Sequence, residues 1–184
     1  MLNNTKIFVI DFEDSFTFNI ASELYKYEKN IEVISHTDFF SNEFFNLIIG
    51  IKQNRIAVIL GPGPGHPNTF SNYFDKIRIL KTKKNIFILG ICLGHQIISL
   101  INGFKVRPSI KPLHGNQVKI DFNSKNILVQ RYNSLSVYVN DSSTEELMVN
   151  KWDRGISYQF HPESVGTHNS RIFFNDLLDF VHSK

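Results

Sequence analysis

The sequence predicts an α/β protein whose doubly wound, mostly parallel sheet is flanked by helices. Over residues 7–91, short apolar runs of strand length alternate with segments of helical periodicity, the pattern of successive strand–helix–strand units. The runs are apolar throughout, as in strands that are buried on both faces. In such sheets ligands bind at the carboxyl ends of the strands, so the residues that follow each run are the first candidates for a site.

Four strands and four helices are expected in the first part of the chain. The strands are predicted at residues 7–10, 31–34, 56–60 and 86–91. The helices are predicted between and after them, at residues 16–27, 44–48 and 70–80 and from about residue 94. Asp14 or Ser15 is expected to cap the first helix, and Asn68 or Thr69 the third.

The second part of the chain has a different pattern. It predicts extra short antiparallel strands, added to the sheet or forming a small second sheet, at residues 118–122, 127–130, 137–139, 147–149 and 156–160. A last helix is expected at residues 170–181. No internal repeat, low-complexity tract or linker interrupts the chain. We therefore expect one domain over residues 1–184, with a flavodoxin-like core.

Composition narrows the class of protein. The 184 residues are 42% hydrophobic and 20% charged, with a net charge of only +3, as in ordinary soluble domains. The lysine cluster at residues 81–84 falls where a helix should end, so no nucleic-acid partner is expected. One cysteine excludes an intrachain disulfide and fits a reducing compartment. No apolar run has the length of a signal peptide or a membrane span, so we expect a cytoplasmic protein without a membrane partner.

The strongest candidate for a catalytic residue is Cys92, which follows the apolar run at residues 86–91 and precedes a helical pattern. Gly90 and Gly94 lie two residues on either side of it, the spacing of a nucleophile elbow. Neighbours without a Cβ allow the strand and the helix to pack closely around a strained turn. The free N–H groups of the helix N-terminus favour a thiolate and a developing oxyanion. The alternative is an inert, buried cysteine.

His161 is the best candidate for the base that a cysteine nucleophile needs. It follows a predicted strand, and Pro162 favours an extended backbone, in which residues two apart point to the same side. Glu163 is then placed to orient the imidazole, as the third member of a triad. His95 is the main rival, because it lies three residues after Cys92 on the helix, but no carboxylate is placed to orient it.

The loop Gly61-Pro-Gly-Pro-Gly65 follows the third predicted strand. The loop could have only a structural role, as a rigid turn. Alternatively, its glycines would let a backbone N–H approach an acyl oxygen beside the N–H of Leu93, so that the two N–H groups form an oxyanion hole. It lacks the Gly-Lys-Ser/Thr of a Walker A loop. Zinc is not expected, because no second Cys or His stands at ligand spacing.

Together these segments resemble the class I (triad) glutamine amidotransferases, and within them the small subunits of anthranilate synthase and aminodeoxychorismate synthase. The segments that match stand in the family's order and cover most of the chain: Asp14-Ser-Phe-Thr-Phe-Asn19, Gly61-Pro-Gly-Pro-Gly65, Gly90-Ile-Cys-Leu-Gly-His-Gln96, His114-Gly115, Arg131-Tyr-Asn-Ser-Leu135 and Gln159-Phe-His-Pro-Glu-Ser164. The elbow and the last segment are highly specific as a pair.

The resemblance implies that Cys92 attacks the side-chain amide of L-glutamine to form a γ-glutamyl thioester, with His161 as proton shuttle and Glu163 orienting it. It also implies that ammonia passes through a channel to a larger chorismate-binding subunit, in a heterodimer or heterotetramer. No cofactor is implied in this chain, since a Mg ion would belong to the partner subunit. The residues implied to bind glutamine and its oxyanion are Gly63, Pro64, Gly65, Leu93, Gln96, Ser134 and Leu135.

Two residues depart from the family pattern, and neither belongs to the triad. Asn133 stands where the family usually has histidine, and Asn116 stands where lysine is common. The resemblance leaves two products open, anthranilate for tryptophan and aminodeoxychorismate for folate. Two other functions remain as alternatives: a free-standing cysteine hydrolase of γ-glutamyl compounds, and an inactive partner-binding module of the same fold.

Overall fold

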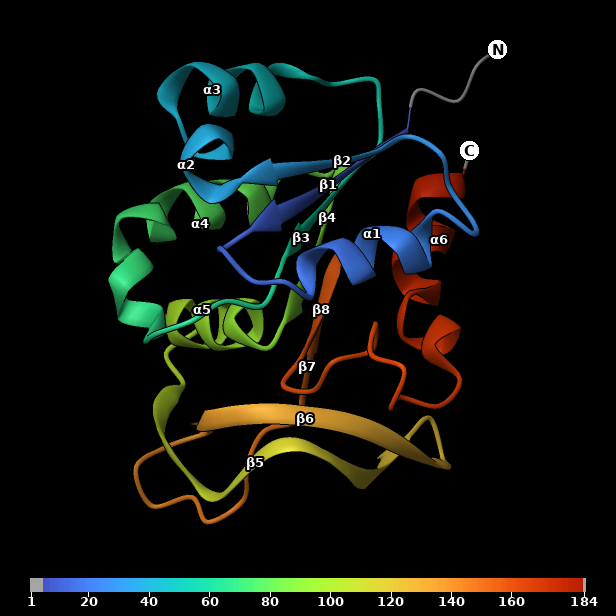
Figure 1. Cartoon of the computed structure of the whole chain (residues 1–184). Helices are drawn as coiled ribbons and strands as arrows, with labels where there is room; N and C mark the ends of the chain where they lie inside the picture. Colours follow the sequence, from blue (N-terminus) through green and yellow to red (C-terminus); the bar gives the residue numbers. More distant parts are fainter. Residues whose placement is uncertain (1–4, 184) are drawn as a thin grey trace.

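A six-stranded sheet forms the centre of the protein, as shown by a computed structural model that describes residues 5–183 (Figure 1). Its strand order is β2-β1-β3-β4-β8-β7. All neighbouring strands are parallel except β7 and β8, which are antiparallel. The strands are β1 (Lys6–Asp11), β2 (Ile31–Ser35), β3 (Ile56–Leu60), β4 (Ile86–Ile91), β7 (Val149–Trp152) and β8 (Gly155–Tyr158).

Helices cover both faces of this sheet, and each face has its own apolar core. One core joins α1 and α6 to one face, and the other joins α2, α3, α4 and α5 to the opposite face. Alternate residues of β1 point into different cores, Ile7 and Val9 into the first and Phe8 and Ile10 into the second, because side chains alternate along a strand. The helices are α1 (Thr17–Leu24), α2 (His36–Phe39), α3 (Asn42–Gly50), α4 (Phe74–Thr82), α5 (Leu93–Ile101) and α6 (Asn175–His182), with 3₁₀ turns at Pro67–Tyr73 and Ser170–Phe173.

The doubly wound, mostly parallel sheet flanked by helices is confirmed. The four strands expected in the first part are β1 to β4, and β3 and β4 have the expected bounds. The caps differ from the expectation. Asp14 accepts a hydrogen bond from Phe16 N at 2.8 Å, one residue before α1 begins, and His66 caps the Pro67–Tyr73 turn through Asn68 N.

The second part of the chain differs from the expected series of short strands. Residues 118–122 belong to the long β5 (Lys105–Phe122), and residues 127–130 and 137–138 belong to β6 (Lys125–Tyr138). These two strands pair antiparallel as a separate two-stranded sheet, which lies across one end of the molecule in Figure 1. The register shifts after Pro108 and after His114, and most of β5 is exposed, so its sequence carries little alternation of apolar and polar residues.

Candidate active site

Cys92 lies on a sharp turn between β4 and α5. Its φ of 52° and ψ of −100° are conformations that L-residues rarely adopt, and its N–H donates to Tyr158 O on β8 at 2.8 Å. A Cβ on Gly94 would lie 2.0 Å from Leu60 O on β3, so only glycine lets the helix pack this closely. The strand–cysteine–helix turn expected from the glycine spacing is therefore present.

The Gly-Pro loop runs beside Cys92 from the carboxyl end of β3. Gly63 is wedged between two neighbours, because a Cβ there would lie 2.5 Å from Leu93 Cδ2 and 2.6 Å from Phe12 Cβ. Gly63, Pro64 and Gly65 line the same cavity as Cys92. Leu93 is the first residue of α5, so its N–H has no acceptor within the helix. The two N–H groups expected to hold an oxyanion thus belong to adjacent segments.

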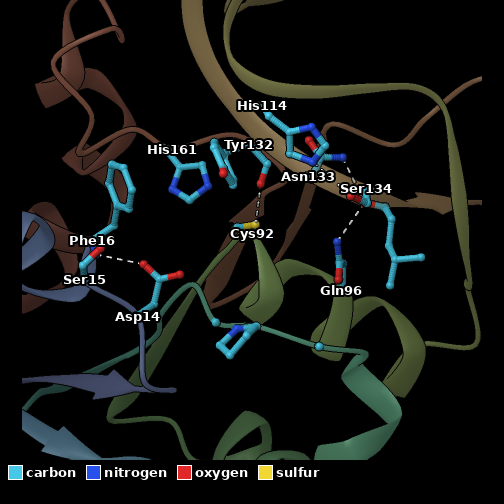
Figure 2. Close-up of a pocket in the computed structure, with 14 residues that line it drawn as sticks. Asp14, Ser15, Phe16, Cys92, Gln96, His114, Tyr132, Asn133, Ser134 and His161 are labelled. Atoms are coloured by element: carbon cyan, nitrogen blue, oxygen red, sulfur yellow. Dashed lines mark hydrogen bonds between the residues drawn. The ribbon is translucent and has the colours of Figure 1, made fainter.

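His161 and Glu163 follow β8 and are joined as expected. His161 Nδ1 lies 2.8 Å from Glu163 Oε1, and the two residues are only 3% and 7% exposed. His161 N donates to Gln130 O at 2.9 Å, and the ring packs against Phe16 with 5.4 Å between ring centroids. Figure 2 shows the imidazole beside the Cys92 sulfur. The backbone contact and the ring contact together fix the imidazole in place.

The charges around His161 favour its protonated form. Burial lowers the pKa of His161, but its interactions with the neighbouring Cys92 side chain and the hydrogen bond and charge of Glu163 outweigh burial and hold the pKa well above its ordinary value. Within the described residues, His161 Nε2 is buried and has no hydrogen-bond partner. The arrangement therefore suits a thiolate–imidazolium pair.

We expect the turnover of a reaction in which Cys92 attacks and His161 donates a proton to fall at alkaline pH, because the imidazolium is lost as the pH rises through the raised pKa of His161. Glu163→Gln removes a negative charge that raises this pKa. The alkaline limb should therefore move to lower pH, and kcat should fall by about 10- to 100-fold with a smaller change in KM. Steady-state rates across pH test this. A large rise in KM with unchanged kcat would contradict an orienting role for Glu163.

The cavity above Cys92 has a volume of about 560 Å³ and lies between the main sheet and the β5–β6 sheet. Figure 2 shows His161 and Gln96 on opposite sides of Cys92. Gln96 Nε2 donates to Leu135 O at 2.9 Å, and the Ser134 hydroxyl is 3.0 Å from His114 Nε2. Of the residues expected from the sequence, all but Leu93 and Glu163 line this cavity. The other lining residues, which were not among the catalytic or substrate-binding residues expected from the sequence, are Asp14, Ser15, Phe16, His114, Tyr132 and Asn133.

Asn133 supports the wall of the cavity from a buried position. Its amide donates to Leu135 O at 2.9 Å and accepts from Arg131 Nε at 3.1 Å. Arg131, which is buried, in turn forms an ion pair with the partly buried Glu146, with 2.6 Å between Nη2 and Oε2. The other departure, Asn116, is exposed on β5 opposite Arg131. Asn133 thus links the Leu135 carbonyl to the ion pair of Arg131 and Glu146.

This ion pair should contribute to stability in a pH-dependent way. Burial raises the pKa of Glu146, but hydrogen bonds from Ser109 and Arg131 and the charge of Arg131 outweigh it and lower the pKa. The contribution is present above the ordinary carboxyl pKa and is lost as the pH falls through the lowered value. Glu146→Gln should cost about 1–2 kcal/mol at neutral pH and less at about pH 3. Urea denaturation at both pH values measures this; an equal difference at both would contradict it.

His95, the rival base, belongs to the core. Its two ring nitrogens contact Ser157 Oγ and Leu147 O, each at 2.8 Å. Burial lowers the pKa of His95 to about 4, so the ring is neutral at physiological pH. Both ring nitrogens are therefore engaged in structural contacts.

Two features are absent from residues 5–183. No group of three or more His, Cys, Asp or Glu side chains is arranged to hold a metal ion in this part of the chain. Among the same residues, no helix has the length and apolar character needed to cross a membrane.

Known proteins resemble this chain along most of its length. The bifunctional protein TrpGD of Thermotoga maritima is 30% identical over 95% of the chain, and the anthranilate synthase component 2 of Helicobacter pylori is 29% identical over 96%. A putative aminodeoxychorismate synthase of Schizosaccharomyces pombe is 33% identical over 97% of the chain. The chain spans 32% of the Thermotoga protein, 97% of the Helicobacter protein and 27% of the Schizosaccharomyces protein.

A solved structure has the same fold as this chain, and a family model matches its sequence. A putative GMP synthase subunit from Thermoplasma acidophilum has the same fold, with a TM-score of 0.76 and 20% identity over 96% of this chain and 94% of that chain. The sequence model described as glutamine amidotransferase class-I matches residues 8–180. The chain belongs to the class-I glutamine amidotransferases.

Proposed function

We propose that this chain is the glutaminase subunit of a chorismate-using synthase, which hydrolyses L-glutamine through a cysteine thioester and passes ammonia to its partner. One observation carries the proposal most directly. In a member of the class-I family, Cys92 occupies a strained elbow beside a buried imidazole that is bonded to Glu163. This is the arrangement of nucleophile, base and orienting carboxylate that acyl transfer requires.

The first half-reaction releases ammonia. The Cys92 sulfur attacks the side-chain carbonyl carbon of glutamine, and the carbonyl oxygen becomes an oxyanion held by the N–H groups of Gly63 and Leu93. His161 gives its proton to the amide nitrogen, the carbon–nitrogen bond breaks, and ammonia leaves. Glu163 holds the imidazole in the tautomer and orientation that this transfer needs.

The second half-reaction restores the thiolate. His161, now neutral, takes a proton from a water molecule that attacks the γ-glutamyl thioester. The carbon–sulfur bond then breaks, and glutamate leaves. The sum of the two halves is glutamine and water converted to glutamate and ammonia, with no redox step and no cofactor held by this chain.

The proposed glutamine site uses the wall opposite His161. Gln96 Nε2 is engaged by Leu135 O, which leaves its amide oxygen for the substrate. Ser134 and Leu135 would bind glutamine mainly through their backbone, and the loop of Gly63, Pro64 and Gly65 closes the cavity near the reacting carbonyl. These contacts are polar and few, as in sites that fix the orientation of a small substrate.

The names of the relatives support the proposed partner. The Helicobacter protein, of similar length, is named anthranilate synthase component 2, and the longer Schizosaccharomyces protein is named a putative aminodeoxychorismate synthase. We infer a complex with a larger chorismate-binding subunit, as a heterodimer or heterotetramer in the cytoplasm, in which any Mg ion belongs to that subunit. We also infer that the chain is a single domain, since its two cores share one sheet.

Trapping the acyl-enzyme tests the proposal. The chain is mixed with glutamine, quenched in acid and digested, and the peptide that contains Cys92 is weighed by mass spectrometry. A mass increase of one γ-glutamyl group, removed by hydroxylamine, is expected. The samples are quenched at times shorter than one catalytic cycle. If glutamine is hydrolysed but no adduct is found at any of these times, the thioester route is contradicted.

Adding the partner separates the alternatives. A synthase subunit encoded by the same genome should raise ammonia release, and the complete complex given chorismate and glutamine should form either anthranilate or aminodeoxychorismate, identified by mass. Full activity that no partner changes would favour a free-standing hydrolase of γ-glutamyl compounds. Absence of turnover with an unreactive Cys92 would favour a binding module.

A further inference from the structure

Gln159 is a wholly buried side chain that contacts the reacting sulfur. It follows β8, has 0% of its surface exposed, and is anchored by a hydrogen bond of 3.0 Å from its own N–H to Met148 O. Its side-chain nitrogen Nε2 lies 3.9 Å from Cys92 Sγ, and its oxygen Oε1 lies 3.3 Å from Gln96 Nε2. A buried amide of this kind is costly unless both of its ends have partners.

The orientation of the Gln159 amide follows from a backbone group. Leu135 O can only accept hydrogen bonds, so the Gln96 group 2.9 Å from it must be the NH₂ group. The second hydrogen of that NH₂ group points to the Gln159 side chain, which must therefore present its oxygen. The NH₂ group of Gln159 is then left facing the Cys92 sulfur. Leu135 O thus sets the direction of both amides, with a donor at the sulfur.

A second group on the sulfur has the opposite preference. Tyr132 O lies 3.8 Å from Cys92 Sγ and can accept a hydrogen bond only from a protonated thiol. A thiolate has no hydrogen to donate, and it accepts from Gln159 more strongly than a thiol does, because the acceptor is charged. The two contacts therefore favour different protonation states of the same sulfur.

We propose that Gln159 is a catalytic residue that donates a hydrogen bond to the Cys92 thiolate, and that Gln96 and Leu135 O hold it in the donating orientation. The inference deepens the function proposed above and rests on it for its place in catalysis. It also connects the glutamine-binding wall to the nucleophile.

Other titratable groups face the same sulfur or lie near it. His161 follows β8 beside Gln159, with Glu163 behind it. His114 on β5 and Asp14 before α1 line the same cavity. The test therefore compares variants that leave all of these groups unchanged.

The test is the rate of alkylation of Cys92 by iodoacetamide as a function of pH, in the full chain. Gln159→Met keeps the length of the side chain and removes the donor. The midpoint of its rate–pH curve should lie about one unit above that of the unmodified protein, with about tenfold slower alkylation at pH values below both midpoints. Its kcat should fall by about tenfold with a smaller change in KM. A folded variant with an unmoved midpoint overturns the proposal.

Two further variants separate this role from a structural one. Ser157→Ala, on β8, removes a buried hydrogen bond to His95 without touching the sulfur, and should lower Tm but leave the midpoint unchanged. Gln96→Met leaves Gln159 in place but removes the donor that fixes it, so the midpoint should rise; this variant decides the matter if Gln159→Met does not fold. An unmoved midpoint in Gln96→Met also counts against the proposal.

The alkylation assay contains no glutamine, so the two proposals fail separately. A protein that does not hydrolyse glutamine, but whose midpoint rises in Gln159→Met, would refute the proposed function and support the contact between Gln159 and the sulfur. A protein that hydrolyses glutamine, but whose midpoint does not respond, would refute the role of Gln159 alone.

Discussion

Cys92→Ala is expected to reduce glutamine hydrolysis by at least about 10⁴-fold, because no other group in the cavity can form the thioester. His161, bonded to Glu163 through Nδ1, has no sulfur and cannot form a thioester in place of Cys92. Ammonia release from glutamine, measured with the purified partner present, tests this. Activity that survives Cys92→Ala would exclude the proposed mechanism.

The same position offers a matched control for folding. Cys92 has a φ of 52°, where glycine is favoured over every residue with a Cβ. Cys92→Gly should be as inactive as Cys92→Ala but more stable than it, by about 1 kcal/mol in the free energy of unfolding. Urea denaturation of the two variants measures the difference. An alanine variant at least as stable as the glycine variant would show that the turn stores no strain.

The sheet was predictable where burial gives a continuous apolar run. Strands β3 and β4 are buried along their whole length, and their bounds follow directly from Ile56–Leu60 and Ile86–Ile91. Only residues 118–122 of β5 were predicted, because the rest of the strand is mostly exposed and its register shifts after Pro108 and after His114. β8 was expected as an antiparallel addition, but it lies parallel to β4 and extends the main sheet. β8 is only four residues long, so the sequence did not indicate which strand it would pair with.

The site was predictable for a related reason. The carboxyl ends of β3, β4 and β8 meet at one edge of the sheet, so the Gly-Pro loop, Cys92 and His161 are brought together by topology. Gln159 was not assigned, although it stands two residues before His161, because its role depends on where its amide points. Phe16 was predicted only as a residue of the first helix, and its contact with the His161 ring was not predicted. Outside helices and strands the sequence has no periodicity that predicts where a side chain points.

The turn around Cys92 is held in place by residues that do not line the cavity. Its helix packs on β3 at Gly94, where Gly94 N donates to Gly61 O at 3.2 Å. The same contact places the start of the Gly-Pro loop beside the first turn of α5. The turn at Cys92 and the Gly-Pro loop are therefore held against each other by one close backbone approach.

Gly94→Ala is expected to cost at least about 3 kcal/mol in the free energy of unfolding, because its Cβ would lie 2.0 Å from Leu60 O and 2.7 Å from Leu60 C, both backbone atoms of a buried strand. The start of α5 would have to move away from β3, and it would carry Cys92 and Leu93 with it. Gly50→Ala is the matched control: Gly50 ends α3, has no atom within 4 Å of an added Cβ, and should gain up to about 1 kcal/mol. Urea denaturation of both variants checks the pair. Similar midpoints for the two would mean that the close approach at Gly94 does not hold the elbow in place.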